Sequence, residues 1–151
     1  MDSDLAQATY GDMPHLASLD YDLFEEPWEQ SDFKKAWHDH QNIVIRDKKK
    51  KVIAYCFYSK NDEGGVEIIR IAVNQEYQLK GLGTKILQFI LTNEKFLTFE
   101  ATLRETNLAG QLFFKKLGFK CIKQLKDFFN DTHEDAYYFF LKKEAEKPIL
   151  I

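Results

Sequence analysis

Hydrophobic residues in the first third of the chain recur at helical spacing in two segments. The apolar positions are Leu16, Leu19, Leu23 and Phe24 in the first segment, and Phe33, Ala36 and Trp37 in the second. Asp12 is expected to cap the first helix, which has Pro14 in its first turn, and Ser31 is expected to cap the second. A short strand is expected before both helices, over Ala6–Thr9.

The pattern then changes to segments rich in β-branched and aromatic residues. Asn42–Arg46 and Val52–Tyr58 flank Asp47 and four consecutive lysines, which predicts a hairpin with a solvated tip. A second turn, Asn61–Gly65, leads to a further strand over Val66–Val73. Three strands joined by two tight turns predict an antiparallel meander.

A helical pattern with a broad apolar face follows at Gly81–Asn93, and a strand is expected at Phe96–Leu103. A strand, a helix and another strand form a βαβ unit, which requires parallel pairing and a right-handed crossover. The last expected elements are a helix and two antiparallel strands, Leu108–Lys116, Phe119–Leu125 and Ala136–Leu141. Together these elements predict an α+β fold, with a mixed, mainly antiparallel sheet that contains one parallel junction in its middle.

Composition narrows the class of protein. A chain of 151 residues fits a single domain, expected over 1–151, and a net charge of -3 argues against binding nucleic acid through a basic surface. The acidic start and the short apolar runs predict neither a secretory signal nor a membrane span. Cys56 and Cys121 have no metal-ligand spacing, so a reduced, cytoplasmic protein without a metal is expected.

The segment between Val66–Val73 and the next helix contains two closely spaced glycines, in Gln78-Leu79-Lys80-Gly81-Leu82-Gly83-Thr84. Glycines let a backbone approach a ligand closely, and the first N–H groups of a helix have no partner inside the helix. Together with the helix dipole, such groups can bind a diphosphate. The same pattern also fits a simple loop-to-helix turn, but the spacing fits neither an ATPase loop nor a dinucleotide fingerprint.

The residues around this loop carry a family resemblance. Ile71-Ala72-Val73 followed by Gln78-x-x-Gly81-x-Gly83 resembles the acetyl-CoA motif of the GNAT N-acetyltransferase superfamily. Asn107-x-Ala109, followed by Phe113-Phe114-Lys115-Lys116-Leu117-Gly118-Phe119, resembles the second motif of that superfamily. Phe24–Trp28 and Glu134–Ala136 are similar to the RimI-type branch, which acetylates protein N-termini. The resemblance extends from about Ala8 to Leu141.

The resemblance implies a GNAT fold in which the central parallel strand pair splays apart and acetyl-CoA enters the gap. The backbone of Ile71 and Val73 would then bind the pantetheine arm, and Asn107 would reach the arm from the other side. Backbone N–H groups of Gln78 to Thr84 would hold the pyrophosphate. The full set assigned to acetyl-CoA is Ile71, Ala72, Val73, Gln78, Leu79, Lys80, Gly81, Leu82, Gly83, Thr84, Asn107, Phe113 and Phe114.

The sequence departs from the RimI pattern at its catalytic positions. Thr102 stands where that pattern has its catalytic glutamate, and Phe114 stands where it has a tyrosine. Glu67 falls at the general-base position of histone-type lysine acetyltransferases, and Glu100 shares a strand face with Thr102. Glu67 and Glu100 are therefore the candidate catalytic residues, although either also fits a solvated or ion-paired acid. Desolvation of Glu67 would raise its pKa and suit a base.

For several other residues, the sequence allows either a functional or a structural role. Cys56 and Cys121 would serve as nucleophiles in a ping-pong route, but buried, inert thiols are the favoured reading. Arg70 and Arg104 would bind a substrate carboxylate or form salt bridges to neighbours. The aromatic side chains Phe113, Phe114, Tyr137 and Tyr138 are expected in the core more than in a pocket.

These inferences predict an acetyl-CoA-dependent N-acetyltransferase acting on a primary amine, with a protein or peptide N-terminus as the leading acceptor. Acetylation of a small-molecule amine or a lysine side chain is the alternative enzyme function. The departures at Thr102 and Phe114 leave open a CoA-binding module with weak or no catalysis. Neither nucleic acid nor a membrane is expected as a partner.

Overall fold

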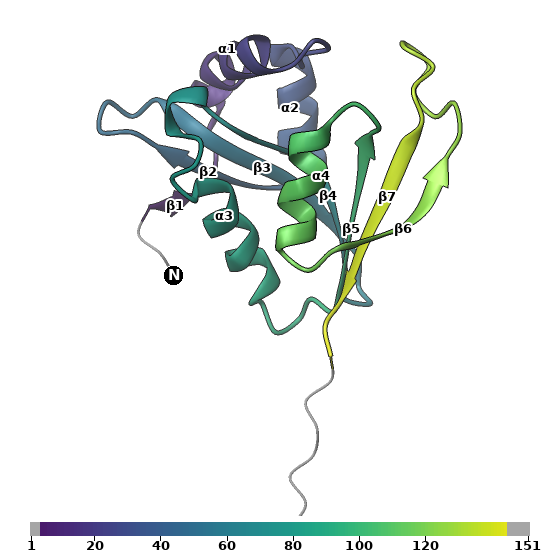
Figure 1. Ribbon diagram of the computed structural model, residues 1–151. Helices are drawn as coiled ribbons and strands as arrows, with labels where there is room; N and C mark the ends of the chain where they lie inside the picture. The colour runs from purple at the N-terminus through teal and green to yellow at the C-terminus, as the bar shows by residue number, and fades with distance from the viewer. Residues whose placement is uncertain (1–3, 145–151) are drawn as a thin grey trace, which may run out of the picture.

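The computed structural model describes residues 4–144, and within them seven strands form one mixed sheet (Figure 1). The strands are β1 Leu5–Ala6, β2 Gln41–Arg46, β3 Val52–Lys60, β4 Gly65–Val73, β5 Thr98–Arg104, β6 Lys120–Leu125 and β7 Ala136–Lys142. The helices are α1 Met13–Leu23, α2 Gln30–Asp39, α3 Leu82–Leu91 and α4 Leu108–Lys116, with short 3₁₀ turns η1 Tyr10–Asp12 and η2 Gln75–Tyr77. The strand order is β1-β2-β3-β4-β5-β7-β6. No helix in the described part of the chain combines the length and apolar character needed to cross a membrane.

The predicted topology is confirmed. Strands β2, β3 and β4 form the antiparallel meander, and β6 and β7 form the final antiparallel pair. Strands β4 and β5, joined through α3, are parallel neighbours. The α+β class predicted from the periodicities therefore holds.

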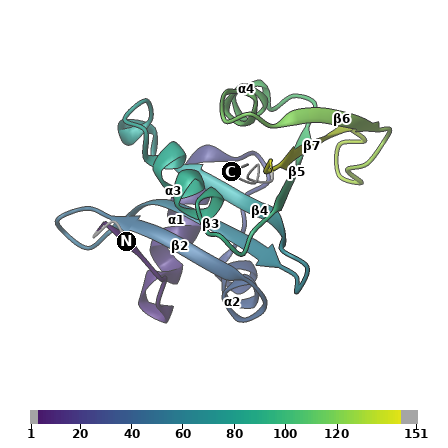
Figure 2. The same ribbon diagram turned by 90° about the horizontal axis from the view of Figure 1, so that it is seen from below.

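The helices lie on both faces of the sheet (Figure 2). Ile86, Leu87 and Ile90 of α3 belong to a core cluster on one face, with α4 on the same side. Leu16 of α1 and Phe33 of α2 belong to a second cluster on the opposite face. The apolar stripes that predict these helices are thus the surfaces that they bury against the sheet.

The parallel pairing of β4 with β5 is shorter than either strand. It runs from Gly65 opposite Thr98 to Ile68 opposite Ala101, whereas β4 continues to Val73 and β5 to Arg104. The register of β4 against β3 shifts at the same point, because Phe57 pairs with Arg70 while Tyr58 pairs with Ile68. Ile69 is therefore an extra residue, and a bulge of this kind bends and twists its strand. The two strands separate directly after the bulge.

One expected boundary in the N-terminal half is wrong, whereas Asp12 is the N-cap residue of α1 as expected. The first strand is Leu5–Ala6 rather than Ala6–Thr9, because Ala8 donates its N–H to the Asn42 side chain and Thr9 donates its N–H to Asp12. These bonds to side chains replace the sheet ladder. Asp12 does precede α1, but its carboxylate serves Thr9 and Arg46 rather than the start of that helix.

Two further boundaries differ from expectation. Helix α2 begins one residue before Ser31, with Glu29 as the N-cap residue, because the Asp32 carboxylate accepts the Glu29 N–H at 2.9 Å. Strand β5 begins at Thr98 rather than Phe96, because Leu97 N–H and Thr98 N–H both donate to the carbonyl of Gly64, in the turn between β3 and β4. Phe96 is buried, so its apolar character reflects packing in a loop.

A buried ion pair ties the bulged strand to the α1 side of the molecule. Asp20 of α1 is fully buried and accepts hydrogen bonds from Arg70 Nε at 2.9 Å and Nη2 at 2.6 Å. The Trp28 N–H and the Tyr55 hydroxyl also donate to Asp20. Burial, followed by the Asp20 charge, raises the pKa of Tyr55 well above its ordinary value, so this hydroxyl stays a donor. One carboxylate thus connects α1, β3, β4 and the segment after α1.

We expect Asp20→Asn to destabilise the fold by about 3–5 kcal/mol, because it leaves the Arg70 guanidinium enclosed without a counter-charge. Urea unfolding followed by circular dichroism measures this loss. Asp22→Asn is the matched control, since Asp22 lies on the same helix and is exposed. Equal unfolding midpoints for the two variants would show that the pair contributes no net stability.

Candidate active site

The loop Gln78–Thr84 connects the end of η2 to the start of α3 and has an unusual backbone. Leu79 and Gly81 both have positive φ, 67° and 78°, and Gly81 occupies the N-cap position of α3. The first intrahelical bond at this end runs from Lys85 N–H to the Gly81 carbonyl at 2.9 Å. The N–H groups of Leu82, Gly83 and Thr84 therefore have no partner within the helix and, with the helix dipole, favour an anion.

Gly83 is required at the point where three elements meet. A Cβ atom on Gly83 would lie 3.3 Å from the Phe113 ring of α4 and 3.6 Å from Val73 Cγ2 of β4. The absence of a side chain lets α3 approach both neighbours closely. The loop Gln78–Thr84, the end of β4 and α4 are thereby held together.

The free edge of β4 presents a defined set of backbone groups. Asn74 N–H donates to the Ile53 carbonyl at 2.7 Å, which sets the alternation of hydrogen bonds between β3 and β4. By that alternation, Ala72 bonds to β3, whereas the N–H and carbonyl groups of Ile71 and Val73 point to the side that β5 has left. The Val73 carbonyl accepts a bond from Gln78 Nε2 at 3.0 Å. The Ile71 groups and the Val73 N–H remain directed at the gap.

Three other residues assigned to the cofactor, Asn107, Lys80 and Phe114, make contacts within the protein. The Asn107 side-chain oxygen caps α4 by accepting the Gly110 N–H at 2.9 Å, which leaves its amide nitrogen to donate. The ammonium group of Lys80 lies 5.3 Å from the centre of the Tyr77 ring. Phe114 is 3% exposed, and its ring packs in the core 5.0 Å from that of Phe119, so its contact with the cofactor stays a prediction.

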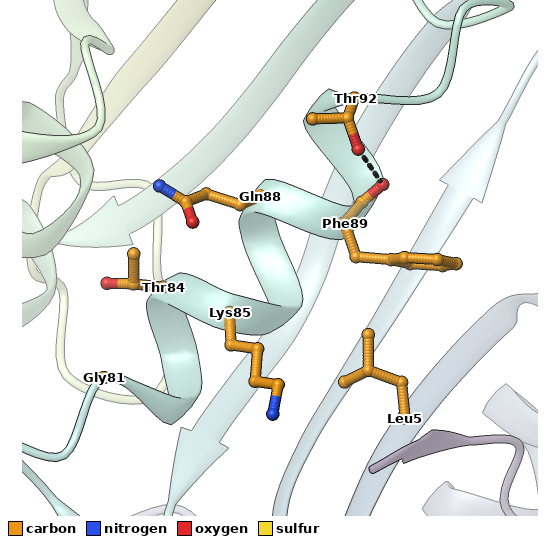
Figure 3. Close-up of a pocket in the computed structure, with 7 residues that line it drawn as sticks. All are labelled: Leu5, Gly81, Thr84, Lys85, Gln88, Phe89 and Thr92. Carbon is orange, nitrogen blue, oxygen red and sulfur yellow. Dashed lines mark hydrogen bonds between the residues drawn. The ribbon is translucent and has the colours of Figure 1, made fainter. Parts of the chain in front are cut away.

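A surface hollow of about 430 Å³ lies along α3 and meets the loop Gln78–Thr84 at Gly81 and Thr84 (Figure 3). Lys85, Gln88 and Phe89 continue its lining along the helix, and Figure 3 shows Thr84 and Gln88 projecting away from the side of Phe89. The hollow belongs to the α3 side of the sheet. The two candidate carboxylates face the other side.

Glu67 and Glu100 lie side by side on that second face. They are direct partners in the parallel pairing of β4 with β5, so their side chains point the same way from strands about 4.8 Å apart. Val66 and Ile68 pack into the α3 cluster, which places Glu67 on the α1–α2 side. The pair stands one residue before the last rung of the parallel ladder, where β4 and β5 separate.

The surroundings of Glu67 favour its protonated form. Although Glu67 is exposed, partial desolvation first and the Glu100 charge second raise its pKa, whereas His40 at the end of α2 acts in the opposite direction. The Tyr138 hydroxyl donates a hydrogen bond to Glu100. This bond, with desolvation and the Glu100 and Glu67 charges, raises the pKa of Tyr138 to about 12.

Tyr138 is the residue that sequence reasoning missed. It was expected in the core, and that expectation is wrong for Tyr138, whereas Tyr137 packs against the α3 cluster. The sequence did contain a clue to this position. Successive side chains of a strand point to opposite faces, so Tyr138 must face away from its buried neighbour Phe139. Its hydrogen bond to Glu100 could not be predicted, because the two residues are 38 positions apart in the sequence.

The two cysteines differ from one another. Cys56 is buried, and burial raises the pKa of its thiol, as expected for an inert cysteine. Cys121 is exposed on the edge strand β6, so the expectation of a buried thiol is wrong there.

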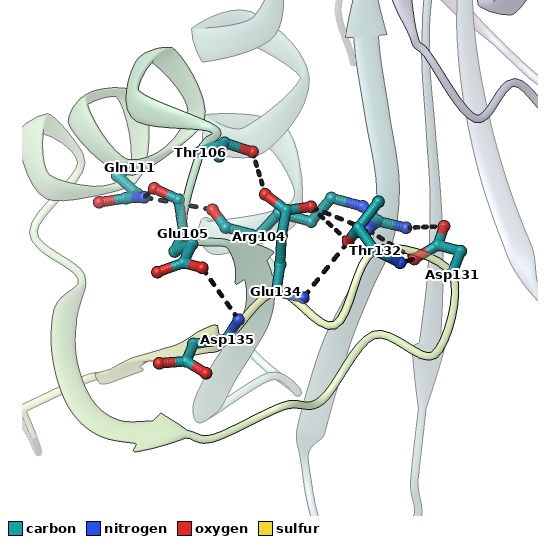
Figure 4. Close-up of polar contacts among 8 residues, drawn as sticks. All are labelled: Arg104, Glu105, Thr106, Gln111, Asp131, Thr132, Glu134 and Asp135. Atoms are coloured by element: carbon teal, nitrogen blue, oxygen red, sulfur yellow. Dashed lines mark hydrogen bonds and ion pairs between the residues drawn. The ribbon is translucent and has the colours of Figure 1, made fainter.

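Both arginines form salt bridges within the protein. Arg70 binds Asp20, and Arg104 lies between Asp131 at 2.8 Å and Glu134 at 3.1 Å (Figure 4). The Arg104 guanidinium also stacks 4.0 Å from the centre of the Phe129 ring. A hydrogen bond from Thr106, others from Thr132 and Arg104, and the Arg104 charge lower the pKa of Glu134. The loop between β6 and β7 is thereby fixed to the end of β5.

Comparison with known proteins agrees with this geometry. The model of the acetyltransferase (GNAT) family matches residues 13–119. An uncharacterized N-acetyltransferase of Methanocaldococcus jannaschii is 26% identical over 148 residues, 93% of this chain and 92% of the relative.

Solved structures of two enzymes with different acceptors share the fold. The ribosomal-protein-S18-alanine N-acetyltransferase of Escherichia coli has a TM-score of 0.79 and 21% identity, covering 97% of this chain and 98% of that one. The spermidine/spermine N-acetyltransferase of Vibrio cholerae has a TM-score of 0.69 and 18% identity, covering 91% and 93%. With a family match over more than half of its length, this chain belongs to the GNAT family and is an N-acetyltransferase.

Proposed function

We propose that this N-acetyltransferase transfers an acetyl group from acetyl-CoA to the α-amine of a protein or peptide, with Glu67 as the general base. The observation that carries the proposal is the position of Glu67, beside Glu100 at the point where β4 and β5 separate. A base is needed there because an ammonium group cannot attack a carbonyl carbon. The raised pKa of Glu67 makes it a stronger base than an ordinary glutamate.

Acetyl-CoA supplies the activated acetyl thioester. In the proposal, the N–H groups of the loop Gln78–Thr84 hold its pyrophosphate, and the gap-facing groups of Ile71 and Val73 bond to its pantetheine arm. The Asn107 amide nitrogen donates from the α4 side, and Phe113 contributes an apolar wall beside Gly83. The close packing at Gly83 and the positive φ of Gly81 support a loop shaped for a phosphate group.

Glu67 first takes a proton from the ammonium form of the acceptor and passes it to solvent. It then accepts the second proton, which the amine loses as the new C–N bond forms and the C–S bond breaks. The departing thiolate needs a proton in exchange. Phe114 has no hydroxyl, and the Tyr138 hydroxyl is directed at Glu100. Thiols have a pKa of about 8.5, so water can protonate the thiolate near neutral pH. Glu67 then returns its proton to solvent, which restores the enzyme to its starting protonation state.

Two well-fixed segments support a peptide acceptor. The segment after α1 is tied down where the Trp28 N–H binds Asp20, and Phe24 stacks 4.1 Å from the Arg70 guanidinium. The loop between β6 and β7 is held by Arg104. Both segments adjoin the splayed ends of β4 and β5, and parts of both resemble the RimI-type branch. The fold shared with the alanine N-acetyltransferase is compatible with this assignment.

We expect Glu67→Gln to lower kcat by about 100-fold or more, because the amide keeps the shape of the side chain and removes its basicity. Affinity for CoA should stay unchanged. Wild-type kcat/KM should rise with pH through the raised pKa of Glu67, since the base must be ionised, and the variant should lose this acidic limb. Steady-state kinetics of thiol release measure both effects. Glu63→Gln, in the exposed turn before β4, is the control, and near-normal kcat in Glu67→Gln would place the base elsewhere.

We expect Gly83→Asp to weaken CoA binding by at least about 10-fold, or 1.4 kcal/mol, because it adds bulk against Phe113 and a negative charge beside the pyrophosphate. Isothermal titration calorimetry measures the affinity. Gly11→Asp places the same charge on an exposed turn and should bind CoA normally. A folded Gly83→Asp protein with unchanged affinity would remove the cofactor from this loop.

We expect peptides with free N-termini to be acetylated faster than spermidine or free lysine. The measurement is a panel of these acceptors at equal concentration with acetyl-CoA and thiol detection. Peptides with a blocked N-terminus and an internal lysine are the control for side-chain acetylation. Turnover confined to spermidine would assign a small-molecule acceptor instead.

A further inference from the structure

We propose that Tyr138 is a positioning residue that decides which of two adjacent carboxylates takes the proton from the acceptor amine. Its hydroxyl donates a hydrogen bond to Glu100 and not to Glu67, so the proton goes to Glu67. This inference rests on the proposed function, since it concerns the base of that reaction. It assigns Glu100 a role different from that of Glu67, although the two residues have the same chemistry.

The two glutamates are adjacent but differ in their hydrogen bonds. They are register partners on adjacent parallel strands and point to the same face. The Tyr138 hydroxyl, on β7, reaches Glu100 on the next strand of the sheet. Tyr138 lies opposite Thr102, two residues after Glu100, so the bond runs diagonally across the β5–β7 pair. Glu67 has no such donor among the hydrogen bonds of residues 4–144.

Two carboxylates at this separation do not ionise independently. Each negative charge makes the other carboxylate harder to ionise, so the first proton goes to the one that is less stabilised as an anion. A hydrogen bond to a carboxylate stabilises the ionised form. The donor on Glu100 therefore leaves Glu67 as the proton acceptor, and the charge held on Glu100 strengthens Glu67 as a base.

The other groups around Glu67 do not explain why Glu67, rather than Glu100, accepts the proton. On β3, its register partner is Ser59, which is uncharged at working pH. His40, at the end of α2, acts on Glu67 in the sense that favours ionisation, which opposes the effect of Glu100. Arg70, on the same strand, is held by Asp20. Tyr138 is the group that distinguishes the two glutamates.

A direct role for Tyr138 as the acid that protonates the departing thiolate fits less well. Its hydrogen already bonds to Glu100, and that bond would have to break first. With its pKa raised to about 12, the phenol also gives up its proton less readily than a free tyrosine. The hydroxyl therefore acts on Glu100.

The test uses Tyr138→Phe, which keeps the ring and removes the donor. Tyr137→Phe is the matched control, because Tyr137 is adjacent and packs on the opposite face against the α3 cluster. The first readout is a carboxyl NMR titration of Glu67 and Glu100 in the full chain. In the wild type, Glu67 should titrate above the ordinary glutamate value. In Tyr138→Phe, the Glu67 midpoint should fall by about 0.5 unit or more, while Tyr137→Phe leaves it in place.

The second readout is the pH profile of kcat/KM. The acidic limb should move to lower pH in Tyr138→Phe, because the proton is then shared with Glu100. Glu100→Gln provides an independent check that does not depend on the folding of Tyr138→Phe, and it should lower the Glu67 midpoint toward the ordinary glutamate value. Unmoved midpoints in a folded Tyr138→Phe protein, or an unmoved Glu67 midpoint in Glu100→Gln, would overturn the inference.

These outcomes are separable from the proposed function. If Glu67→Gln keeps normal kcat, the base assignment fails whatever the titration shows. If Glu67→Gln is inactive but Tyr138→Phe leaves both titrations unchanged, the assignment of the base stands and the role of Tyr138 fails.

Discussion

The bulge at Ile69 is the constraint on which the rest of this structure depends. One extra residue in β4 changes its register against β3, and the pairing of β4 with β5 ends at the preceding residue, Ile68. Without that separation, the gap-facing groups of Ile71 and Val73 would bond to β5 as in any parallel sheet. Arg70, the residue after the bulge, is held by the buried Asp20. The bend in β4 is therefore fixed from the α1 side of the sheet.

The separation of the strands also divides the site between two faces. The loop Gln78–Thr84 and the packing at Gly83 lie on the α3 side, where the helix N-terminus favours an anion. Glu67 and Glu100 lie on the α1–α2 side, where their negative charge suits an incoming amine. A thioester bound in the gap would meet an amine from the opposite face, so cofactor and acceptor need not compete for the same surface.

The carboxylate pair implies a cost in stability. Because the pKa of Glu67 is raised in the folded chain, the folded state binds a proton more readily than the unfolded state. Its contribution to the free energy of unfolding therefore falls as pH rises from the ordinary glutamate pKa through the raised one, and stays low at neutral pH. A pair of like charges is kept at the end of the parallel ladder despite this cost, as is common at sites that carry chemistry.

The order and type of the elements could be predicted from the amino-acid sequence, because each depends on periodicity and turn chemistry within a short stretch of chain. Gly81 and Gly83 also indicated the turn into α3, since a positive φ and a close approach to neighbouring elements are local requirements that glycine meets. Only the tertiary structure decided which side chains meet. Tyr138 and Glu100 are 38 residues apart, and Arg70 and Asp20 are 50 apart. Their contacts follow from strand order, register and the bulge at Ile69, and a one-residue change in register would turn the side chains to the other face. For the same reason the different surroundings of the two glutamates could not be predicted from the chain alone.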